Sequence, residues 1–248
     1  LLTLTACDPN HYVAPETGID PETGEPSDEP LLGKGVFTYD AYEPLGNKPI
    51  NVYYYVPASA DPDSPIVFVF HGTNRNAEDY RDTWISKAEQ YNLMVFAPEY
   101  RSAFFPGSSG YNLGNVFTNG ENPSEQTLND SSIWTFSTIE PMFDSVISRT
   151  SNNSETYHLF GHSAGGQFVH RFVLFNPGAR FGTAIASNSG WYTVPDATIE
   201  FPYGLGVTPL ENGSKGYFSR NLIIQIGELD NDPESSALRH TEEADAQG

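Results

Sequence analysis

The sequence has little cysteine, little positive charge and no long apolar run. Its 248 residues include one cysteine, which excludes an internal disulfide and any site built from several thiolates. No run of about 20 apolar residues is present to span a membrane as a helix. Twelve basic residues face 32 acidic ones, and the net charge of −20 makes nucleic acid an unexpected partner because its phosphates would be repelled. The length suffices for one large α/β domain with a sizeable core.

The single cysteine lies near the start of the sequence. Leu4-Thr5-Ala6-Cys7 resembles the end of a bacterial lipoprotein signal peptide, in which small residues lead to a lipidated cysteine. Residues 8–30 are acidic, rich in proline and glycine, and too poor in apolar residues to fold. We expect a signal-peptide remnant at 1–7, a disordered linker at 8–30 and a folded domain at 31–248. The protein would be anchored to the bacterial cell envelope through Cys7, or secreted; the alternative is a chance cysteine.

From residue 31 onward, apolar segments typical of strands alternate with segments of helical spacing. Two β-rich segments predict an opening antiparallel pair, and a continuous apolar run at 66–70 predicts a strand buried on both faces of a parallel sheet. Helices are expected at 77–91 and at 137–149, the second opened by a capping box of Ser137 and Glu140. The pattern predicts an α/β fold with a mostly parallel sheet. The expected strands are 35–39, 50–56, 66–70, 93–97, 157–160, 181–186 and 221–226.

The residues Gly161-His-Ser-Ala-Gly165 match G-x-S-x-G, in which a serine occupies a strained turn between a strand and a helix. The apolar strand before the turn and the helical pattern at 167–175 after it supply the context that this short motif needs. Ser163 is therefore the predicted nucleophile; a structural turn is the alternative. The backbone N–H of Ala164 is expected to serve as one oxyanion donor.

Two other strand ends carry candidate site residues. His71-Gly72-Thr73 follows the buried strand at 66–70, and Thr73 is the expected second oxyanion donor, unless the segment is only a turn. Trp191 and Tyr192 follow the strand at 181–186, at the edge of the sheet where ligands bind, and are candidates for the substrate pocket or for ordinary packing. The irregular, aromatic segment 98–134 is expected to form a wall beside the site; the alternative is an excursion of the chain over the surface.

An activated serine also needs a histidine and a carboxylate, in the chain order serine, acid, histidine. Asp230, just beyond the strand at 221–226, is the expected acid, with Asp232 and Glu228 as rivals. The histidine is the difficulty. His240 alone follows Asp230, and ten residues leave no room for the helix and strand that normally separate acid and base. We expect the true base to lie past Gly248, in a chain that lacks its last strand and helix.

The remaining histidines lie in unsuitable segments: the spacer, the loop after 66–70, the strand before Ser163, the turn itself and the helix after it. The i, i+4 pair His158 and His162 has a metal-like spacing, but on a strand and turn this spacing does not bring the two rings together. We expect neither a metal site nor a cofactor. These histidines are His11, His71, His158, His162 and His170.

Three motifs, at 70–77, 161–172 and 190–192, together resemble the α/β-hydrolase superfamily, in the branch of secreted or lipid-anchored esterases similar to poly(3-hydroxybutyrate) depolymerases. The resemblance covers about residue 37 to the end. It implies Ser163 as nucleophile, Asp230 as acid, and Thr73 and Ala164 as oxyanion donors. The resulting hypothesis is a serine esterase acting through an acyl-enzyme. The alternatives are a catalytically inactive binding protein of the same fold, a serine peptidase and an acyltransferase.

Overall fold

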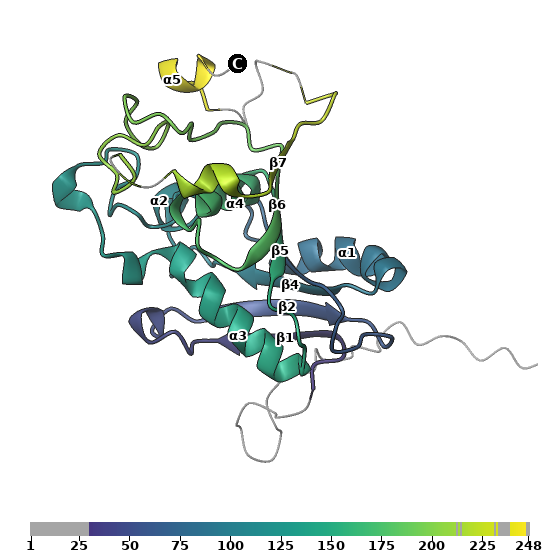
Figure 1. Cartoon of the computed structure of the whole chain (residues 1–248). Helices are drawn as coiled ribbons and strands as arrows, with labels where there is room; N and C mark the ends of the chain where they lie inside the picture. Colours follow the sequence, from purple (N-terminus) through teal and green to yellow (C-terminus); the bar gives the residue numbers. More distant parts are fainter. Residues whose placement is uncertain (1–29, 212, 214, 231, 233–238, 247–248) are drawn as a thin grey trace, which may run out of the picture.

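A computed structural model describes residues 30–211, 213, 215–230, 232 and 239–246 (Figure 1). Within these residues one sheet contains seven strands in the order β1-β2-β4-β3-β5-β6-β7. The pairs β1–β2 and β2–β4 are antiparallel, and all the others are parallel. The predicted α/β fold with a mostly parallel sheet is confirmed. The strands are β1 (Gly33–Tyr39), β2 (Ile50–Val56), β3 (Ile66–Phe70), β4 (Met94–Glu99), β5 (Tyr157–His162), β6 (Phe181–Ser187) and β7 (Leu222–Gln225).

Helices cover both faces of this sheet (Figure 1). Helix α1 (Ala77–Tyr91), as predicted, packs on one face through a small cluster that includes Ala88, Val67 and Val95. Helices α3 (Ile139–Thr150) and α4 (Ala164–Phe175) cover the other face. Both faces of β3 are buried for this reason, which explains its continuous apolar run.

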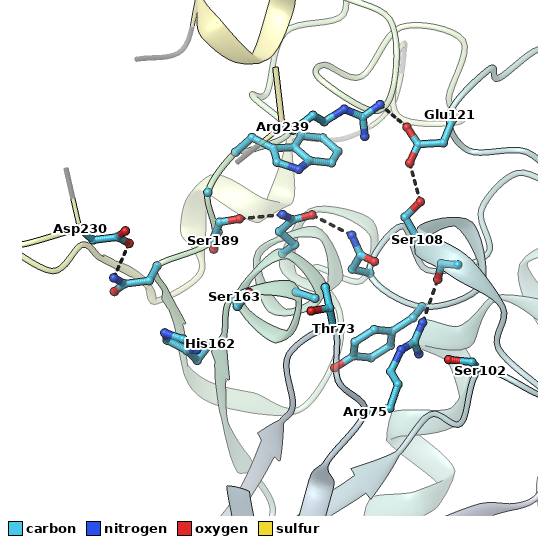
Figure 2. A pocket seen from close by; sticks show the side chains of 18 residues that line it. Thr73, Arg75, Ser102, Ser108, Glu121, His162, Ser163, Ser189, Asp230 and Arg239 are labelled. Atoms are coloured by element: carbon cyan, nitrogen blue, oxygen red, sulfur yellow. Dashed lines mark hydrogen bonds and ion pairs between the residues drawn. The ribbon is translucent and has the colours of Figure 1, made fainter. Parts of the chain in front are cut away.

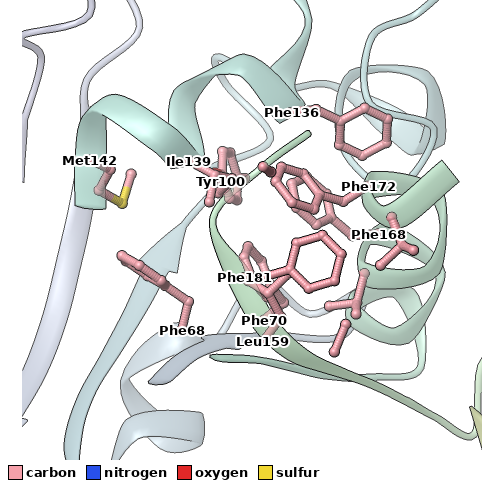
Figure 3. Close-up of a cluster of buried hydrophobic side chains, with 14 of the residues drawn as sticks. Phe68, Phe70, Tyr100, Phe136, Ile139, Met142, Leu159, Phe168, Phe172 and Phe181 are labelled. Carbon is pink, nitrogen blue, oxygen red and sulfur yellow. The ribbon is translucent and has the colours of Figure 1, made fainter. Parts of the chain in front are cut away.

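The larger core lies beneath α3 and α4 and is built mainly from aromatic rings (Figure 3). Phe70 of β3 stacks on Phe168 of α4 with ring centroids 4.6 Å apart, and Phe136 meets Phe168 edge-on at 5.0 Å. Fully burying a phenylalanine side chain contributes about 1.5–3 kcal/mol to stability. Because Phe70 is the last residue of β3 and Phe168 lies in the second turn of α4, this stack fixes two segments that border the site.

The predicted capping box at the start of α3 is wrong. A short 3-10 helix, η4 (Thr135–Thr138), precedes α3, and its residue Ser137 donates to the carbonyl of Ser131. The carboxylate of Glu140 instead accepts from Arg180 at 2.7 Å and from the hydroxyl of Tyr157 at 2.5 Å. Tertiary partners therefore outcompete the local cap.

The predicted lipidation residue Cys7 and residues 8–29 of the predicted linker lie outside the described residues. No helix in the described part of the chain is long and apolar enough to cross a membrane.

Candidate active site

The turn between β5 and α4 places Ser163 in a conformation that few side chains adopt. Its φ of +57° and ψ of −122° lie outside the favoured regions for residues other than glycine. Backbone strain of this kind costs on the order of 1–3 kcal/mol and persists only where the surroundings enforce it. The backbone N–H of Ser163 donates to the carbonyl of Ser187 in β6, at 3.0 Å. The predicted strand, turn and helix are all present, with Ser163 at the tip.

The glycines of the motif allow three segments to approach one another closely. A Cβ on Gly161 would lie 2.1 Å from the carbonyl oxygen of Gly165, and a Cβ on Gly165 would lie 2.1 Å from the carbonyl oxygen of Phe70. Both distances are far below van der Waals contact, so no other residue fits without backbone movement. The glycines thus let β5, α4 and the end of β3 meet directly behind Ser163.

One cavity of about 680 Å³ brings together most of the predicted site residues. Ser163, Ala164, Thr73, Asp230 and Trp191 all line it. In the view of Figure 2, Ser163 lies between Thr73 on one side and Asp230 on the other. The predicted wall is present as well, because Gly107, Ser108, Tyr111 and Asn112 of the segment after β4 also line this cavity.

Tyr192 is the exception among the predicted pocket residues. It does not line the cavity of Ser163; it faces a second cavity, where its ring lies 5.1 Å from that of His170. Its neighbour Trp191, in contrast, lines the cavity of Ser163. The prediction for Tyr192 is therefore corrected.

The loop after β3 is fixed by a buried histidine. His71 is fully buried, and its Nε2 accepts from the backbone N–H of Tyr100 at 3.1 Å. The proton is therefore on Nδ1, which donates to the carbonyl of Gly72 at 2.9 Å. The hydroxyl of Tyr111 donates to the carbonyl of His71 at 2.8 Å. These bonds hold the neighbouring Thr73 in a defined place at the rim of the cavity.

Burial lowers the pKa of His71 to about 4. Because an unfolded histidine binds a proton below about pH 6.5, the unfolded state binds more protons than the folded state between pH 6.5 and pH 4. Stability should therefore fall as the pH falls through this window, and His71 accounts for about 3 kcal/mol of the loss. Urea unfolding at several pH values should show a smaller slope in His71→Gln. Equal slopes in the two proteins would contradict the assignment. Burial also lowers the pKa values of His158 and His170, so both residues contribute to the slope that remains.

Asp230 is anchored to the end of β6. Its Oδ2 accepts from Nδ2 of Asn188 at 2.6 Å, and its backbone N–H donates to the carbonyl of Gly227. Asn188 itself has a φ of +47°, donates its backbone N–H to the carbonyl of Gln225, and follows Ser187, which binds the amide of Ser163. The end of β6 therefore positions both Ser163 and Asp230.

Among the described residues, no histidine forms a hydrogen bond or an ion pair with Ser163 or Asp230. His162 lines the cavity, but its Nδ1 lies 3.3 Å from the hydroxyl of Tyr80 in α1. His240 lies with its Nδ1 3.4 Å from a carboxylate oxygen of Asp245. The rings of His71 and His170 are buried and bonded to the backbone, and His158 lies inside β5. In the described residues, no cluster of potential ligands is arranged to hold a metal ion.

A buried polar network behind the cavity was not predicted. The side chain of Gln167 donates to the carbonyl of Ser189 at 2.7 Å and accepts from Asn112 at 2.7 Å. The guanidinium of Arg171, fully buried, contacts the same Gln167 and stacks over Trp191 with its carbon 4.3 Å from the ring centroid. The spacing of 164, 167 and 171 along one helix face is the signal that could have indicated this network.

Two solved structures are similar to the chain over most of its length. Poly(aspartic acid) hydrolase-1 from Sphingomonas sp. KT-1 shares 41% identity with a TM-score of 0.80, and the match covers 89% of this chain and 80% of that one. LpqC, a poly(3-hydroxybutyrate) depolymerase from Bordetella parapertussis, shares 32% identity with a TM-score of 0.77 over 88% of this chain and 72% of that one. No family model and no curated protein matches the sequence.

A more distant structure shows the same fold. FphF, a fluorophosphonate-binding serine hydrolase from Staphylococcus aureus, has 14% identity and a TM-score of 0.51 over 79% of each chain. The shared fold, the identities of 41% and 32% and the long matched regions all indicate the same family. The chain belongs to the family of α/β-hydrolases that includes poly(aspartic acid) hydrolase-1 and the depolymerase LpqC.

Proposed function

We propose that the protein is a serine hydrolase that cleaves carboxylic esters through an acyl-enzyme on Ser163. The observation that carries the proposal is the position of Ser163, at a strained turn that opens into the same cavity as Asp230. A serine hydroxyl attacks an ester carbonyl, the alcohol leaves, and water then releases the acid. In this proposal, the strained backbone of Ser163 serves to present its hydroxyl at the surface of the cavity.

The proposed oxyanion donors are the backbone N–H groups of Thr73 and Ala164. Ala164 begins helix α4, so its N–H belongs to the first turn, whose N–H groups lack partners within the helix. A Cβ built on Gly72 would lie 3.9 Å from Oγ of Ser163. This short distance supports the proposal that the N–H of the next residue, Thr73, reaches the oxyanion that forms when Ser163 attacks. Donors fixed in advance stabilise the developing oxyanion without reorganisation.

Asp230 is the proposed acid, and its bond from Asn188 supports this role because it fixes the carboxylate in the cavity. The proposal places the general base on a histidine outside the described residues. That histidine would accept the proton of Ser163 and would be held in the correct tautomer by Asp230.

The cavity favours a short, polar acyl group over a long aliphatic chain. Asn112 and Gln167 present buried amides, and Ser108 and Ser189 present hydroxyl groups. Asn112, Gln167 and Ser108 are already bonded to other protein groups. The buried hydroxyl of Ser189 has no partner among the described residues, and a polar acyl group would supply one where an aliphatic group would not. The two similar structures are named for polymers of small acids, which is consistent with this substrate class and with a depolymerase-like activity.

A fluorophosphonate probe tests the proposal on the complete protein. We expect covalent labelling that mass spectrometry maps to Ser163, together with turnover of short-chain p-nitrophenyl esters. Absence of both labelling and turnover in a folded protein would favour an inactive binding protein. Preferential cleavage of peptides would favour the peptidase, and acyl transfer to an added alcohol in place of hydrolysis would favour the acyltransferase.

A further inference from the structure

Two arginines line the cavity of Ser163 in a chain that is otherwise strongly acidic. One of them, Arg239, is paired with the carboxylate of Glu121, which also lines the cavity. The other, Arg75, has no carboxylate within 4.0 Å among the described residues. Arg75 therefore provides a positive charge that the described part of the protein leaves without a direct counter-ion.

Arg75 is also fixed in position before any ligand binds. Its Nη1 donates to the carbonyl of Tyr100 at 2.5 Å and its Nη2 to the carbonyl of Gly107 at 2.9 Å. The guanidinium lies over the ring of Tyr111, with its carbon 4.4 Å from the centroid. A guanidinium has five N–H donors, and these contacts use two of them. The remaining donors are held on a rigid side chain at the cavity.

A carboxylate is the ligand that this arrangement fits best. Arginine binds carboxylates through two parallel hydrogen bonds, which are stronger than bonds between neutral groups. Burial lowers the pKa of Arg75, which shows that its charged form is poorly solvated where it lies. The net charge of −20 does not prevent binding, because exposed charges farther away than about 8 Å are largely screened at physiological ionic strength.

We propose that Arg75 binds a carboxylate carried by the substrate, so that the preferred substrates are half-esters of dicarboxylic acids or chains of such units. The proposal rests on the proposed function, because it assumes that the bond cleaved lies at Ser163. To that function it adds a residue that selects the substrate, Arg75, and the requirement that the substrate carry a negative charge. The alternative is that Arg75 only ties the loop after β3 to the segment after β4, through the carbonyls of Tyr100 and Gly107.

A matched pair of substrates separates the two roles. The p-nitrophenyl monoester of succinate carries a free carboxylate, and its methyl ester has the same succinyl chain with one added methyl group and no charge. We expect the wild-type protein to prefer the charged substrate in kcat/KM. In Arg75→Gln the ratio of the two kcat/KM values should fall by about 10- to 100-fold, which is the usual effect of losing a hydrogen bond to a charged group. A purely structural arginine would lower both values and leave their ratio unchanged.

Arg101 provides the matched control. It lies in the same segment as Tyr100, near Glu99 at 3.8 Å, and does not line the cavity. Arg101→Gln should leave the ratio within about twofold of wild type. Arg75→Lys keeps the charge without the planar fork, and it should retain part of the preference. An unchanged ratio in a folded Arg75 variant, or a wild-type preference for the neutral ester, would overturn the proposal.

A binding experiment keeps this proposal separate from the proposed function. Monomethyl succinate carries one carboxylate and dimethyl succinate carries none. Calorimetric titration should show binding of the first to wild type, with affinity reduced by about 10- to 100-fold in Arg75→Gln. If neither labelling nor turnover is found, the proposed function fails, and this titration still decides the role of Arg75. Equal affinities of both esters for wild type would overturn it.

Discussion

Replacing Ser163 by alanine is expected to lower kcat for a p-nitrophenyl ester by about a million-fold. Removal of a serine nucleophile has effects of this order, because the remaining oxyanion donors and binding groups supply only a small part of the acceleration. The measurement is steady-state hydrolysis with the purified complete protein, at enzyme concentrations high enough to detect the residual rate. Labelling by fluorophosphonate should disappear in the same variant.

The fold should survive this substitution. The side chain of Ser163 makes no capping hydrogen bond in α4, and alanine is strained at a φ of +57° to a similar degree as serine. Thermal unfolding should therefore change little. Ser102, a second serine at the cavity, is the matched control, and Ser102→Ala should keep kcat within about tenfold of wild type. Persistent labelling or hydrolysis in a folded Ser163→Ala protein would place the nucleophile elsewhere.

Replacing Asp230 by asparagine is expected to lower kcat by about ten-thousand-fold. An asparagine has nearly the same shape, but it holds a histidine in the wrong tautomer and cannot stabilise the imidazolium that forms. KM should change little, because the carboxylate is proposed to act on the base and not on the substrate. The measurement is the pair of kcat and KM values for the same ester.

The two rival carboxylates provide the controls for this experiment. Asp232→Asn and Glu228→Gln remove one negative charge each from the same loop, without touching the bond between Asn188 and Asp230. Both variants should retain kcat within about tenfold of wild type. A larger loss in Asp232→Asn than in Asp230→Asn would identify Asp232 as the acid.

The part of the fold that the sequence predicts is the part encoded by local patterns. The helix Ala77–Tyr91 has the predicted bounds, and the continuous run Ile66–Phe70 is the strand with both faces buried. The strand and helix around Ser163 are also found, because the glycines and the two periodicities are visible within twenty residues. Each of these features is determined by residues that lie close together in the sequence.

The features that sequence reasoning missed depend on contacts between distant segments. Ser137 and Glu140 have the spacing of a capping box, yet Glu140 binds Arg180, 40 residues away. Asn188 reaches Asp230 across 42 residues, and nothing in the local sequence marks it as an anchor. Among the described residues, no carboxylate lies within 4.0 Å of Arg75; this is a property of the folded cavity, so it could be found only in three dimensions.

The shared anchor at the end of β6 has a mechanical consequence. Ser187 holds the amide of Ser163, and the next residue, Asn188, holds the carboxylate of Asp230. Two neighbouring residues at the end of one strand therefore position both groups, while Asp230 itself lies in the loop after β7. A displacement of the last residues of β6 would therefore move the backbone amide of Ser163 and the carboxylate of Asp230 together.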